Sequence, residues 1–524
     1  MTRLRQDVRG NTLAMMAIAL IPISALIGSG VDTARLYVVK ARLQQACDAG
    51  VLAGRKAMIS AGTDSFDTTA RDQATTFFRN NFRNGWLNST AASFTPSATA
   101  DNQVTAVARV TVPMTIMKMF GQGDTTLSAT CQARYDVADS DVMFVLDTTG
   151  SMACVGSASS CGQSTVSYKR PDGTNGYRVT EASGSKIQGL RDAVLNFYDT
   201  VKATANPTTH VRYGFVTYSS TVNAGAAILG LNPSYMVSKW KYQSRKKVNS
   251  KWNYAQYEFD VTDFLTAKPV ADPSKDDGSK AQWQGCIEER HTTASSSFDL
   301  NNLPEDLDPN LIPTSDDKTK WAPMWPEVIY QRNGTSAMST ASNGFVACGK
   351  PVSRLALMTR QQVSDYVNAA DFVPFGGTYH DTGMIWGVRM ISPNGIFGAD
   401  TAPWPSRPAP NRYIVFMTDG LMDTSLTTYG LYGMEQLDLR VTGSSSNTSK
   451  DTTYHNTRFL TECAAAKAMN IKVFVIGFGQ KLTAGDPLST CASPGQAYYA
   501  KDNDELNKAF QKIAQQVALL RISQ

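Results

Sequence analysis

The 524-residue sequence has few histidines and lacks several motifs from which enzyme active sites are usually built. It contains only four histidines, and it lacks the Gly-x-x-x-x-Gly-Lys-Ser/Thr loop that cradles phosphates. Its eight cysteines do not show the spacing of zinc ligands. No Ser-His-Asp constellation stands out, and the carboxylates in its motifs are too few for a two-metal hydrolytic centre. We therefore expect a protein that is not an enzyme.

Charge is also sparse. Asp, Glu, Lys and Arg make up 18% of the residues, and the formal net charge is +5. So small an excess gives no general attraction to nucleic acid, which is therefore not an expected partner. The hydrophobic share of 42% is high enough to exclude disorder throughout the chain. A chain of this length has room for roughly two to four domains with buried cores.

A long, apolar stretch without a charged side chain lies near the N-terminus, between Arg9 and Asp32. About 20 apolar residues at about 1.5 Å rise cross the roughly 30 Å hydrocarbon layer of a bilayer. A cleaved signal peptide is the alternative, but it would have a shorter apolar region and an Ala-x-Ala-like site, which is not found here. Arginines precede the span and Asp32 and Asp48 follow it. The positive-inside rule therefore places residues 1–11 in the cytoplasm, residues 12–31 in the membrane and the remainder outside.

Eight cysteines on the non-cytoplasmic side of a membrane are most simply read as four disulfides. Sequence alone does not fix which cysteines pair, so the pairing is a hypothesis from their positions along the chain. It joins cysteines within a short loop, within one inserted region, around one strand near the end, and between the N-terminal helix and a later strand. The pairs are Cys154–Cys161, Cys286–Cys348, Cys463–Cys491 and Cys47–Cys131.

The segment after the span keeps a helical pattern. Leu36, Val39, Leu43, Ala46 and Val51 recur at helical spacing among basic residues, so the helix is expected to continue out of the membrane. Residues 67–81 predict a second helix. Alternating runs at residues 93–100, 104–113 and 125–138 predict antiparallel strands. Residues 32–138 are therefore expected to form a pilin-like α+β segment, a long helix covered by a small sheet.

The region around the predicted span resembles a known family. The run RGNTLAMMAIALIPISALIGSGVDTARLYVVKARLQQACDAGVLAG has a span, then Val-Asp, then a Leu-Gln-x-Ala-x-Asp-Ala-type helix. It is similar to the N-terminal region of TadG-like proteins of tight-adherence (Tad, or Flp) pilus systems. The resemblance implies a Gram-negative envelope protein of the pilus assembly machinery. Such a protein would be a single-pass inner-membrane protein with its bulk in the periplasm, associated with the pilus or exposed at the cell surface. Its partners would be pilus or envelope components.

A metal-binding pattern begins at residue 141, where DVMFVLDTTGSM runs from an apolar strand directly into Asp147, Thr149 and Ser151. A loop at the carboxyl end of a buried strand can aim residues i, i+2 and i+4 at one point, and hard divalent cations prefer oxygen ligands. The run resembles the first motif of a metal-ion-dependent adhesion site (MIDAS) of von Willebrand factor A-type domains. Thr149 supplies the hydroxyl where Ser is usual.

Two further motifs of such a site follow in order. In PFGGTYHDTGM, Thr378 follows a Gly pair and precedes a helix, and in RYIVFMTDGLMD, Asp419 ends another apolar strand. Each motif alone has an ordinary explanation as a cap, loop or turn, but three in order at element boundaries rarely coincide. We therefore predict a divalent cation, with Mg²⁺ as the first candidate and Ca²⁺ or Mn²⁺ as alternatives. Its predicted ligands are Asp147, Thr149, Ser151, Thr378 and Asp419.

Asp381 and Asp423 are close in sequence to these ligands. We expect them to lie behind the metal ligands or at the surface, rather than to bind the metal. His380 is placed in the same class, because a hard-cation oxygen site does not call for histidine.

Alternating helix and strand patterns fill the remainder of the chain. They predict helices at residues 185–205, 457–469 and 504–520, and strands at 211–218, 414–418 and 471–479. Together with the resemblance, they imply that residues 139–524 form an α/β von Willebrand factor A domain with a doubly wound, mostly parallel sheet. The stretch is longer than such a domain needs. Insertions are expected at about residues 153–184, 232–355 and 421–455, because loop-closure costs rise slowly with length.

The largest predicted insertion contains KWKYQSRKKVNSKWNY, in which basic and aromatic residues alternate. One interpretation is a patch that binds nucleic acid, an anionic glycan or lipopolysaccharide through phosphate or carboxylate contacts and stacking. The other is a β-hairpin with a basic solvent face and an aromatic face packed on the domain. The residues of this predicted patch are Lys239, Lys241, Arg245, Lys246, Lys247, Lys251, Trp240 and Trp252.

Two functional hypotheses from different classes follow. In the first, a membrane-anchored protein of Tad/Flp pilus assembly binds a partner's carboxylate through an open coordination position of the metal, as a binding or adhesion component. In the second, the protein is structural. It would be a minor pilin or pilus-tip adhesin whose A domain caps the fibre and whose metal is mainly structural. Finding the protein in sheared pili or only in the inner membrane separates the two.

Overall fold

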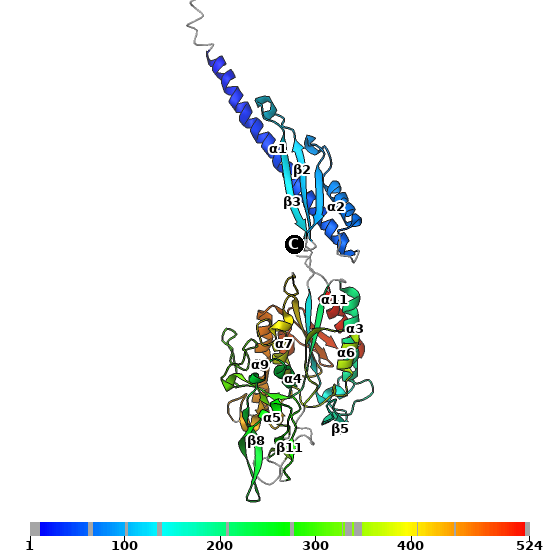
Figure 1. Cartoon of the computed structure of the whole chain (residues 1–524), viewed down its shortest axis with the longest axis vertical. Helices are drawn as coiled ribbons and strands as arrows, with labels where there is room; N and C mark the ends of the chain where they lie inside the picture. Colours follow the sequence, from blue (N-terminus) through cyan, green and yellow to red (C-terminus); the bar gives the residue numbers. More distant parts are fainter. Residues whose placement is uncertain are drawn as a thin grey trace, which may run out of the picture. The chain divides into compact units, whose positions relative to one another are not determined.

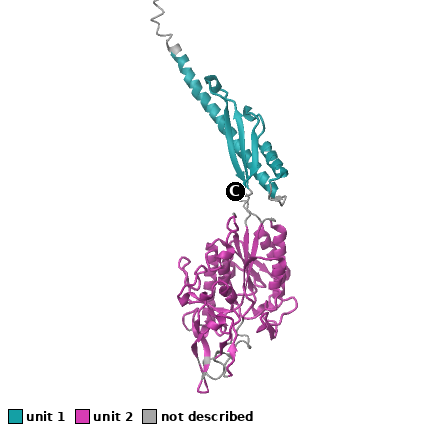
Figure 2. Ribbon diagram, viewed as in Figure 1, with its two compact units in different colours: residues 1–137, 206–208, 522–524 teal, residues 138–205, 209–521 magenta. Residues whose placement is uncertain are grey.

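The computed structural model divides the chain into two compact units, each described by itself (Figure 2). It describes residues 11–60, 66–99, 103–133, 139–205, 209–272, 277–326, 329–330, 338–339, 348–405, 407–444 and 447–518. Unit 1 contains the described residues up to 133, and unit 2 contains those from 139 onward. Residues 1–10, 134–138 and 519–520, which belong to predicted segments, lie outside the described residues.

Unit 1 consists of one long helix covered by a shorter helix and a sheet (Figure 1). The long helix is α1 (Asn11–Ser60), and α2 (Thr68–Asn81) packs along it. The sheet is antiparallel and contains β1 (Ser93–Ala98), β2 (Val104–Val112) and β3 (Thr125–Ala133) in that order. The strands lie where the alternating runs predicted them. Apolar side chains at helical spacing on α1 form the core with alternate residues of β2.

The N-terminal part of α1 is a candidate membrane span. Among the described residues, the helix Met15–Met58 is long and apolar enough to cross a bilayer. The apolar side chains of its first turns are exposed, for example Met16 at 70% and Leu26 at 74%. Apolar side chains left uncovered over several turns require a lipid or protein environment. This helix is therefore consistent with a single-pass membrane anchor.

Asp32 joins α1 to the loop after β2. Its carboxylate accepts the backbone N–H groups of Thr115, Ile116 and Met117 at 2.8–3.3 Å. Arg35, one turn further along α1, donates to two backbone carbonyls of the same unit, at 2.9 and 3.0 Å. Backbone groups in a loop need such partners when no strand or helix pairs them. The Val-Asp of the sequence pattern therefore secures the junction between the helix and the sheet.

The disulfides have the pairing hypothesised from chain positions. One lies in the core of unit 1, between α1 and β3, and three lie in unit 2. None of the cysteines is free in the described residues, which include all eight. The pairs are Cys47–Cys131, Cys154–Cys161, Cys286–Cys348 and Cys463–Cys491.

Unit 2 is built around a six-stranded sheet (Figure 1). All neighbouring strands are parallel except the first pair. β4, near the middle, is buried at every position, as expected of a parallel strand covered on both faces. In spatial order the strands are β16 (Ser353–Leu357), β7 (Val211–Tyr218), β4 (Ser140–Asp147), β17 (Asn411–Thr418), β20 (Ile471–Phe478) and β21 (Ala497–Ala500).

Helices cover both faces of this sheet, each over its own apolar core. Met143 and Val145 of β4 pack with α7 (His380–Ile391) and α9 (Thr448–Ala468). The alternate residue Phe144 packs on the other face with α3 (Lys186–Thr204) and α11 (Asn503–Ala518).

The chain adds β7 and β16 on one side of β4 and the later strands on the other, so the strand order reverses between β4 and β17. Open α/β sheets bind ligands at such a reversal, beyond the carboxyl ends of the strands.

Long connections carry the shorter elements. β5 (Thr165–Lys169) and β6 (Asn175–Val179) precede α3, and α6 (Arg360–Val367) follows β16. Between β7 and β16 lie α4 (Gly225–Leu229), β8 (Lys239–Val248), β9 (Lys251–Asp260), α5 (Thr262–Leu265), β10 (Val270–Ala271), β11 (Lys280–Ala281), β12 (Ile287–Glu288), β13 (Ala322–Pro323), β14 (Ile329–Tyr330) and β15 (Met338–Ser339). Later come β18 (Tyr429–Gly430), β19 (Gly433–Met434), α8 (Glu435–Asp438) and α10 (Pro487–Cys491).

Two element boundaries differ from the sequence prediction. β16 begins at Ser353, inside the range expected as the largest insertion, because this short edge strand has a weak apolar signal. α9 begins at Thr448 rather than at residue 457. Its first turns are polar, and Asn447 caps them by accepting the N–H of Lys450, so the apolar periodicity starts later than the helix does.

Asp32→Ala tests the junction in unit 1. We expect faster hydrogen exchange at the amides of Thr115, Ile116 and Met117, because each loses its acceptor. Exchange mass spectrometry on the detergent-solubilised full chain measures this effect. Asp72→Ala, at an exposed position on α2, should leave exchange there unchanged. Identical exchange at residues 115–117 in Asp32→Ala and wild type would show that Asp32 does not hold this loop.

Candidate metal centre

Two adjacent parallel strands bring the predicted carboxylates together at the point where the strand order reverses. Asp147 is the last residue of β4, and Asp419 directly follows β17. The two strands are in register, with Leu146 opposite Met417. Asp147 is fully buried, and Asp419 is 8% exposed. The register of one strand pair therefore places both carboxylates at the same edge of the sheet.

The turn after β4 adds the two predicted hydroxyls. The N–H of Thr149 donates to Asp147 Oδ1 at 2.8 Å, and Thr149 Oγ1 lies 3.0 Å from Ser151 Oγ. Ser151 Oγ in turn donates to Asp419 Oδ1 at 2.8 Å. The chain then enters a short 3-10 helix, η3 (Gly150–Ala153), which turns residues i, i+2 and i+4 toward one point. Four of the five predicted residues are thus linked by hydrogen bonds.

Thr378 reaches the same place from the loop before α7. The carbonyl of Gly376 accepts the N–H of Gly150 at 3.0 Å, which fastens this loop to the turn after β4. Gly376 has a φ of +94°, a conformation that glycine adopts without strain. Thr378 is 7% exposed, and its carbonyl accepts the N–H of Asp423 at 3.0 Å. The Gly pair of the motif therefore allows the loop before α7 to approach the turn after β4 closely.

A cavity of about 730 Å³ opens in front of these residues. Four of the predicted ligands line it, and Asp147 is buried and hydrogen-bonded to one of them. Asp423 also lines the cavity. The rim includes serines of the loop closed by Cys154–Cys161, together with Gln480. Most of the lining residues are Gly, Ser, Thr, Asp or Gln, so the lining is mainly polar.

Asp147 has a second set of partners, in which Thr418 is the residue that sequence reasoning missed. Thr418 Oγ1 donates to Asp147 Oδ2 at 2.8 Å, and His380 Nε2 lies 3.1 Å from Thr418 Oγ1. Burial lowers the pKa of His380 to about 4, so its ring is neutral at physiological pH. A neutral ring that donates from Nε2 lets Thr418 donate onward to Asp147. The available signal was the Thr that precedes Asp419 at the end of its apolar strand.

The two carboxylates differ in their electrostatic surroundings. Burial, followed by the charge of Asp419, raises the pKa of Asp147 to about 7, although hydrogen bonds from Thr149 and Thr418 act in the opposite direction. Asp419 instead has a cation beside it, because Lys186 Nζ lies 2.6 Å from its Oδ2. A buried carboxylate without a countercharge is unfavourable. A further positive charge next to Asp147 would therefore be electrostatically favourable.

The donor set fits a hard divalent cation. It offers two carboxylates and three hydroxyls, all of them oxygen ligands of the kind that such cations prefer. In the part of the chain that the structure describes, no group of three or more His, Cys, Asp or Glu side chains is arranged to hold a metal. A metal at this position would therefore depend on the Thr and Ser hydroxyls to complete its ligands.

Asp381 takes part in a buried ion network between α7 and α9. Its Oδ2 lies 2.7 Å from His455 Nδ1 and 3.8 Å from Arg458 Nε. His455 Nε2 also lies 3.6 Å from Asp451 Oδ1. All four side chains are nearly or fully buried. Because α7 starts directly after the Thr378 loop, this network holds the base of that loop in place.

The predicted basic and aromatic patch lies on the hairpin β8–β9. Lys239 is paired across the strands with Asp260, and Lys241 with Glu258, so acidic residues face part of the basic row. Trp240 turns inward and donates from Nε1 to Glu288 at 2.8 Å.

Two inward aromatic residues of this hairpin, Tyr242 and Phe259, are buried against Trp325. Lys246 Nζ lies 4.8 Å from the ring centre of Tyr257. Lys251 is exposed, and the side chains of Arg245, Lys247 and Trp252 lie outside the described part of the chain. The described side chains favour the packed-hairpin interpretation.

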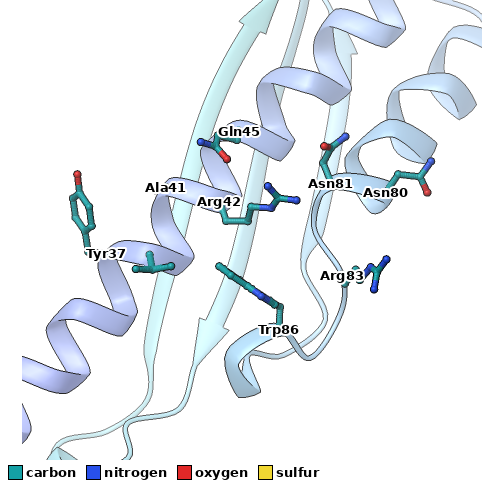
Figure 3. Close-up of a pocket in the computed structure, with 9 residues that line it drawn as sticks. Tyr37, Ala41, Arg42, Gln45, Asn80, Asn81, Arg83 and Trp86 are labelled. Atoms are coloured by element: carbon teal, nitrogen blue, oxygen red, sulfur yellow. The ribbon is translucent and has the colours of Figure 1, made fainter.

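Unit 1 has its own cavity, of about 630 Å³, which contains none of the predicted site residues (Figure 3). Arg42 and Gln45 of α1 line it together with Asn81 of α2 and with Trp86. None of the described residues that line it carries a carboxylate, imidazole or thiol. This cavity therefore lacks the chemistry of a metal centre.

Comparison with known families gives a match for the N-terminal segment. Residues 10–64 match the family described as "Putative Flp pilus-assembly TadE/G-like". The match confirms the resemblance to the Tad (Flp) pilus-assembly family in that segment. Curated proteins gave no match.

Several solved structures are similar at low identity. The pilus adhesin SpaC from Lactobacillus rhamnosus GG is 11% identical, with 82% of this chain and 35% of that chain covered and a TM-score of 0.33. The vWF domain of the type V pili tip protein Mfa5 from Porphyromonas gingivalis is 11% identical, with 74% and 98% covered and a TM-score of 0.31. Proximal thread matrix protein 1 from the mussel byssus, with a zinc-occupied MIDAS motif, is 12% identical, with 74% and 49% covered and a TM-score of 0.28. The chain spans about a third of the SpaC chain, and at these scores none of the matches assigns a function to it.

His455 should make the stability of the protein depend on pH. Burial acts to lower its pKa, but Asp381 and then Asp451 raise it above the ordinary value. A raised folded-state pKa gives a stabilisation that is complete below about 6.5, the ordinary pKa of His, and that is lost as the pH rises through the folded value. We expect the melting temperature of the full chain to show this loss and His455→Gln to lack it. His291→Gln, whose side chain is 48% exposed, is the control and should keep the wild-type profile. Equal pH profiles for His455→Gln and wild type would contradict the prediction.

Proposed function

We propose that unit 2 is a von Willebrand factor A-type domain that binds a divalent cation and, through it, a carboxylate of a protein partner in Tad/Flp pilus assembly. The observation that supports this most strongly is the convergence of three separate sequence motifs on one cavity. The strand reversal between β4 and β17 supports it as well, because it is where such sheets bind ligands. The proposed ligands are Asp147, Thr149, Ser151, Thr378 and Asp419.

In this proposal each side chain has a distinct role. Asp147 and Asp419 supply the negative charge, and the three hydroxyls supply neutral oxygens. Thr418 and His380 orient Asp147 by hydrogen bonds. When bound, the cation supplies the countercharge that is missing beside the Asp147 carboxylate. It also offers an open coordination position for an acidic group. Mg²⁺ is the first candidate, and Ca²⁺ or Mn²⁺ are the alternatives. The role is binding or adhesion rather than catalysis.

Unit 1 supplies the proposed setting. The family match at residues 10–64 and the apolar part of α1 support a single-pass inner-membrane anchor. The arginines before the span support a cytoplasmic N-terminus, and four disulfides fit an oxidising compartment such as the periplasm. The partner would then be a pilus or envelope component with an exposed carboxylate, or a surface glycan to which the cell adheres.

Asp147→Asn tests the metal centre. Mn²⁺ or Mg²⁺ should raise the melting temperature of the wild-type full chain, because a ligand that binds only the folded state stabilises it. Asn should abolish that rise. It should cost little stability without metal, because it removes an uncompensated buried charge and keeps the shape of the side chain. Thermal melting with and without each metal measures both effects, and Asp192→Asn, at an exposed position on α3, is the control. A wild type whose melting is indifferent to every divalent metal would refute the proposal.

A second, structural function is favoured by the part of α1 beyond the predicted span. Tyr37 is 76% exposed, Val38 47% and Leu52 56%, although all three lie on the portion of the helix that follows the apolar run. Exposed apolar residues along a long helix are suited to packing against neighbouring subunits. In this alternative the protein is a minor pilin or pilus-tip adhesin. Its A domain would cap the fibre, and its metal would be mainly structural.

Mechanical shearing of pili distinguishes the two functions. If α1 packs into the fibre, the protein should appear in the sheared fraction, and a Tyr37→Ser, Val38→Ser double variant should be depleted there at unchanged total amount. Quantitative immunoblotting of the sheared and membrane fractions measures this. Tyr499→Ser, which alters an exposed aromatic residue of unit 2, is the control. Strict retention of the wild type in the inner membrane would exclude the structural alternative.

A further inference from the structure

A buried lysine lies beside the candidate metal centre, although no motif of the predicted site contains it. Lys186 is the first residue of α3 and is 1% exposed. Its Nζ lies 2.6 Å from Asp419 Oδ2 and 2.8 Å from the carbonyl oxygen of Ala158. A cation at the start of a helix is opposed by the helix dipole, and burial adds a desolvation cost. The two oxygen partners must therefore offset both penalties.

The loop closed by Cys154–Cys161 holds this lysine at both ends. Ala158, which accepts from the ammonium, lies within that loop. The backbone N–H of Lys186 donates to the carbonyl of Cys154 at 2.8 Å. Serines of the same loop line the cavity in front of the centre. The disulfide-closed loop therefore fixes the position of the ammonium, unlike that of a lysine on a flexible, exposed side chain.

Asp419 therefore faces the ammonium with one oxygen and a proposed metal ligand with the other. Its Oδ2 faces the ammonium of Lys186, while its Oδ1 accepts from Ser151, a proposed metal ligand. A divalent cation held by Asp147 and Asp419 would lie within a few ångströms of the ammonium. At such distances like charges repel appreciably, even at an effective dielectric constant of about 20. Among the described residues, the ammonium of Lys186 is the cation that pairs with Asp419.

We propose that Lys186 is a resident counter-ion of Asp419 that stabilises the metal-free centre and weakens the binding of a divalent cation. This inference rests on the proposed function, because it assumes that the cation binds at this centre. The two carboxylates together balance one divalent cation, so the ammonium leaves the loaded centre with one net positive charge. A centre of this kind binds metal reversibly and favours acidic groups at the open position.

Replacement of Lys186 tests the inference. Lys186→Met removes the charge and keeps the aliphatic length, and Lys186→Gln removes the charge and keeps a hydrogen-bond donor. Isothermal titration of the detergent-solubilised full chain with Mn²⁺ alone should show at least about tenfold tighter binding in both variants, because the nearby like charge is gone. Both should melt at a lower temperature than wild type without metal, because Asp419 loses its buried partner. Lys202→Met, at an exposed position in the last turn of the same helix, should match wild type in both measurements.

The outcomes separate this inference from the proposed function. Unchanged or weaker Mn²⁺ affinity in the variants overturns the role of Lys186 and leaves the metal centre in place. Absence of Mn²⁺ binding in wild type and variants alike overturns the metal centre and the inference with it. If the Met variant does not fold, the Gln variant decides by the same two measurements.

Discussion

Two buried carboxylates that end neighbouring parallel strands are the constraint on which the organisation of unit 2 depends. The register of β4 and β17 brings Asp147 and Asp419 to one point, where their charges oppose each other. Each carboxylate is accommodated differently. Asp147 receives neutral donors from Thr149 and Thr418, and Asp419 receives the ammonium of Lys186. The loops around the centre are arranged so that these donors are in place before any ligand arrives, which is the condition for a preorganised site.

The long connections of unit 2 are attached to the sheet and its helices by buried ion pairs. Arg389 of α7 donates to Glu289, just after β12, at 2.6 Å, and the indole of Trp321 donates to the same carboxylate at 2.9 Å. Arg458 of α9 pairs with Asp306, which lies in the connection between β7 and β16. Buried pairs of this kind add little net stability but strongly disfavour alternative arrangements, because breaking one leaves a buried charge unpaired. The helix that follows the Thr378 loop, α7, and the helix packed against it, α9, therefore also fix the long connection between β7 and β16.

In unit 1 the main structural requirement is to attach a largely apolar helix to a small sheet. The apolar side chains in the first turns of α1 are exposed, whereas further along one face of the helix is buried in the core. Asp32 lies where this change occurs. The Cys47–Cys131 disulfide then links the helix to β3 inside the core. A small sheet buries little apolar area, so a covalent link contributes appreciably to holding it on the helix.

The sequence by itself determined the elements with strong periodicity and the residues with distinctive local patterns. The apolar strands, the amphipathic helices and the three oxygen-rich motifs are visible in it because each depends on neighbours within a few residues of the chain. It did not reveal Lys186, Thr418 or the network of Asp381 with His455. Their partners lie 233, 271 and 74 residues away along the chain. Only the tertiary structure decided which further side chains join the five predicted ones, because strand order and register, not local sequence, bring such distant residues within hydrogen-bonding distance.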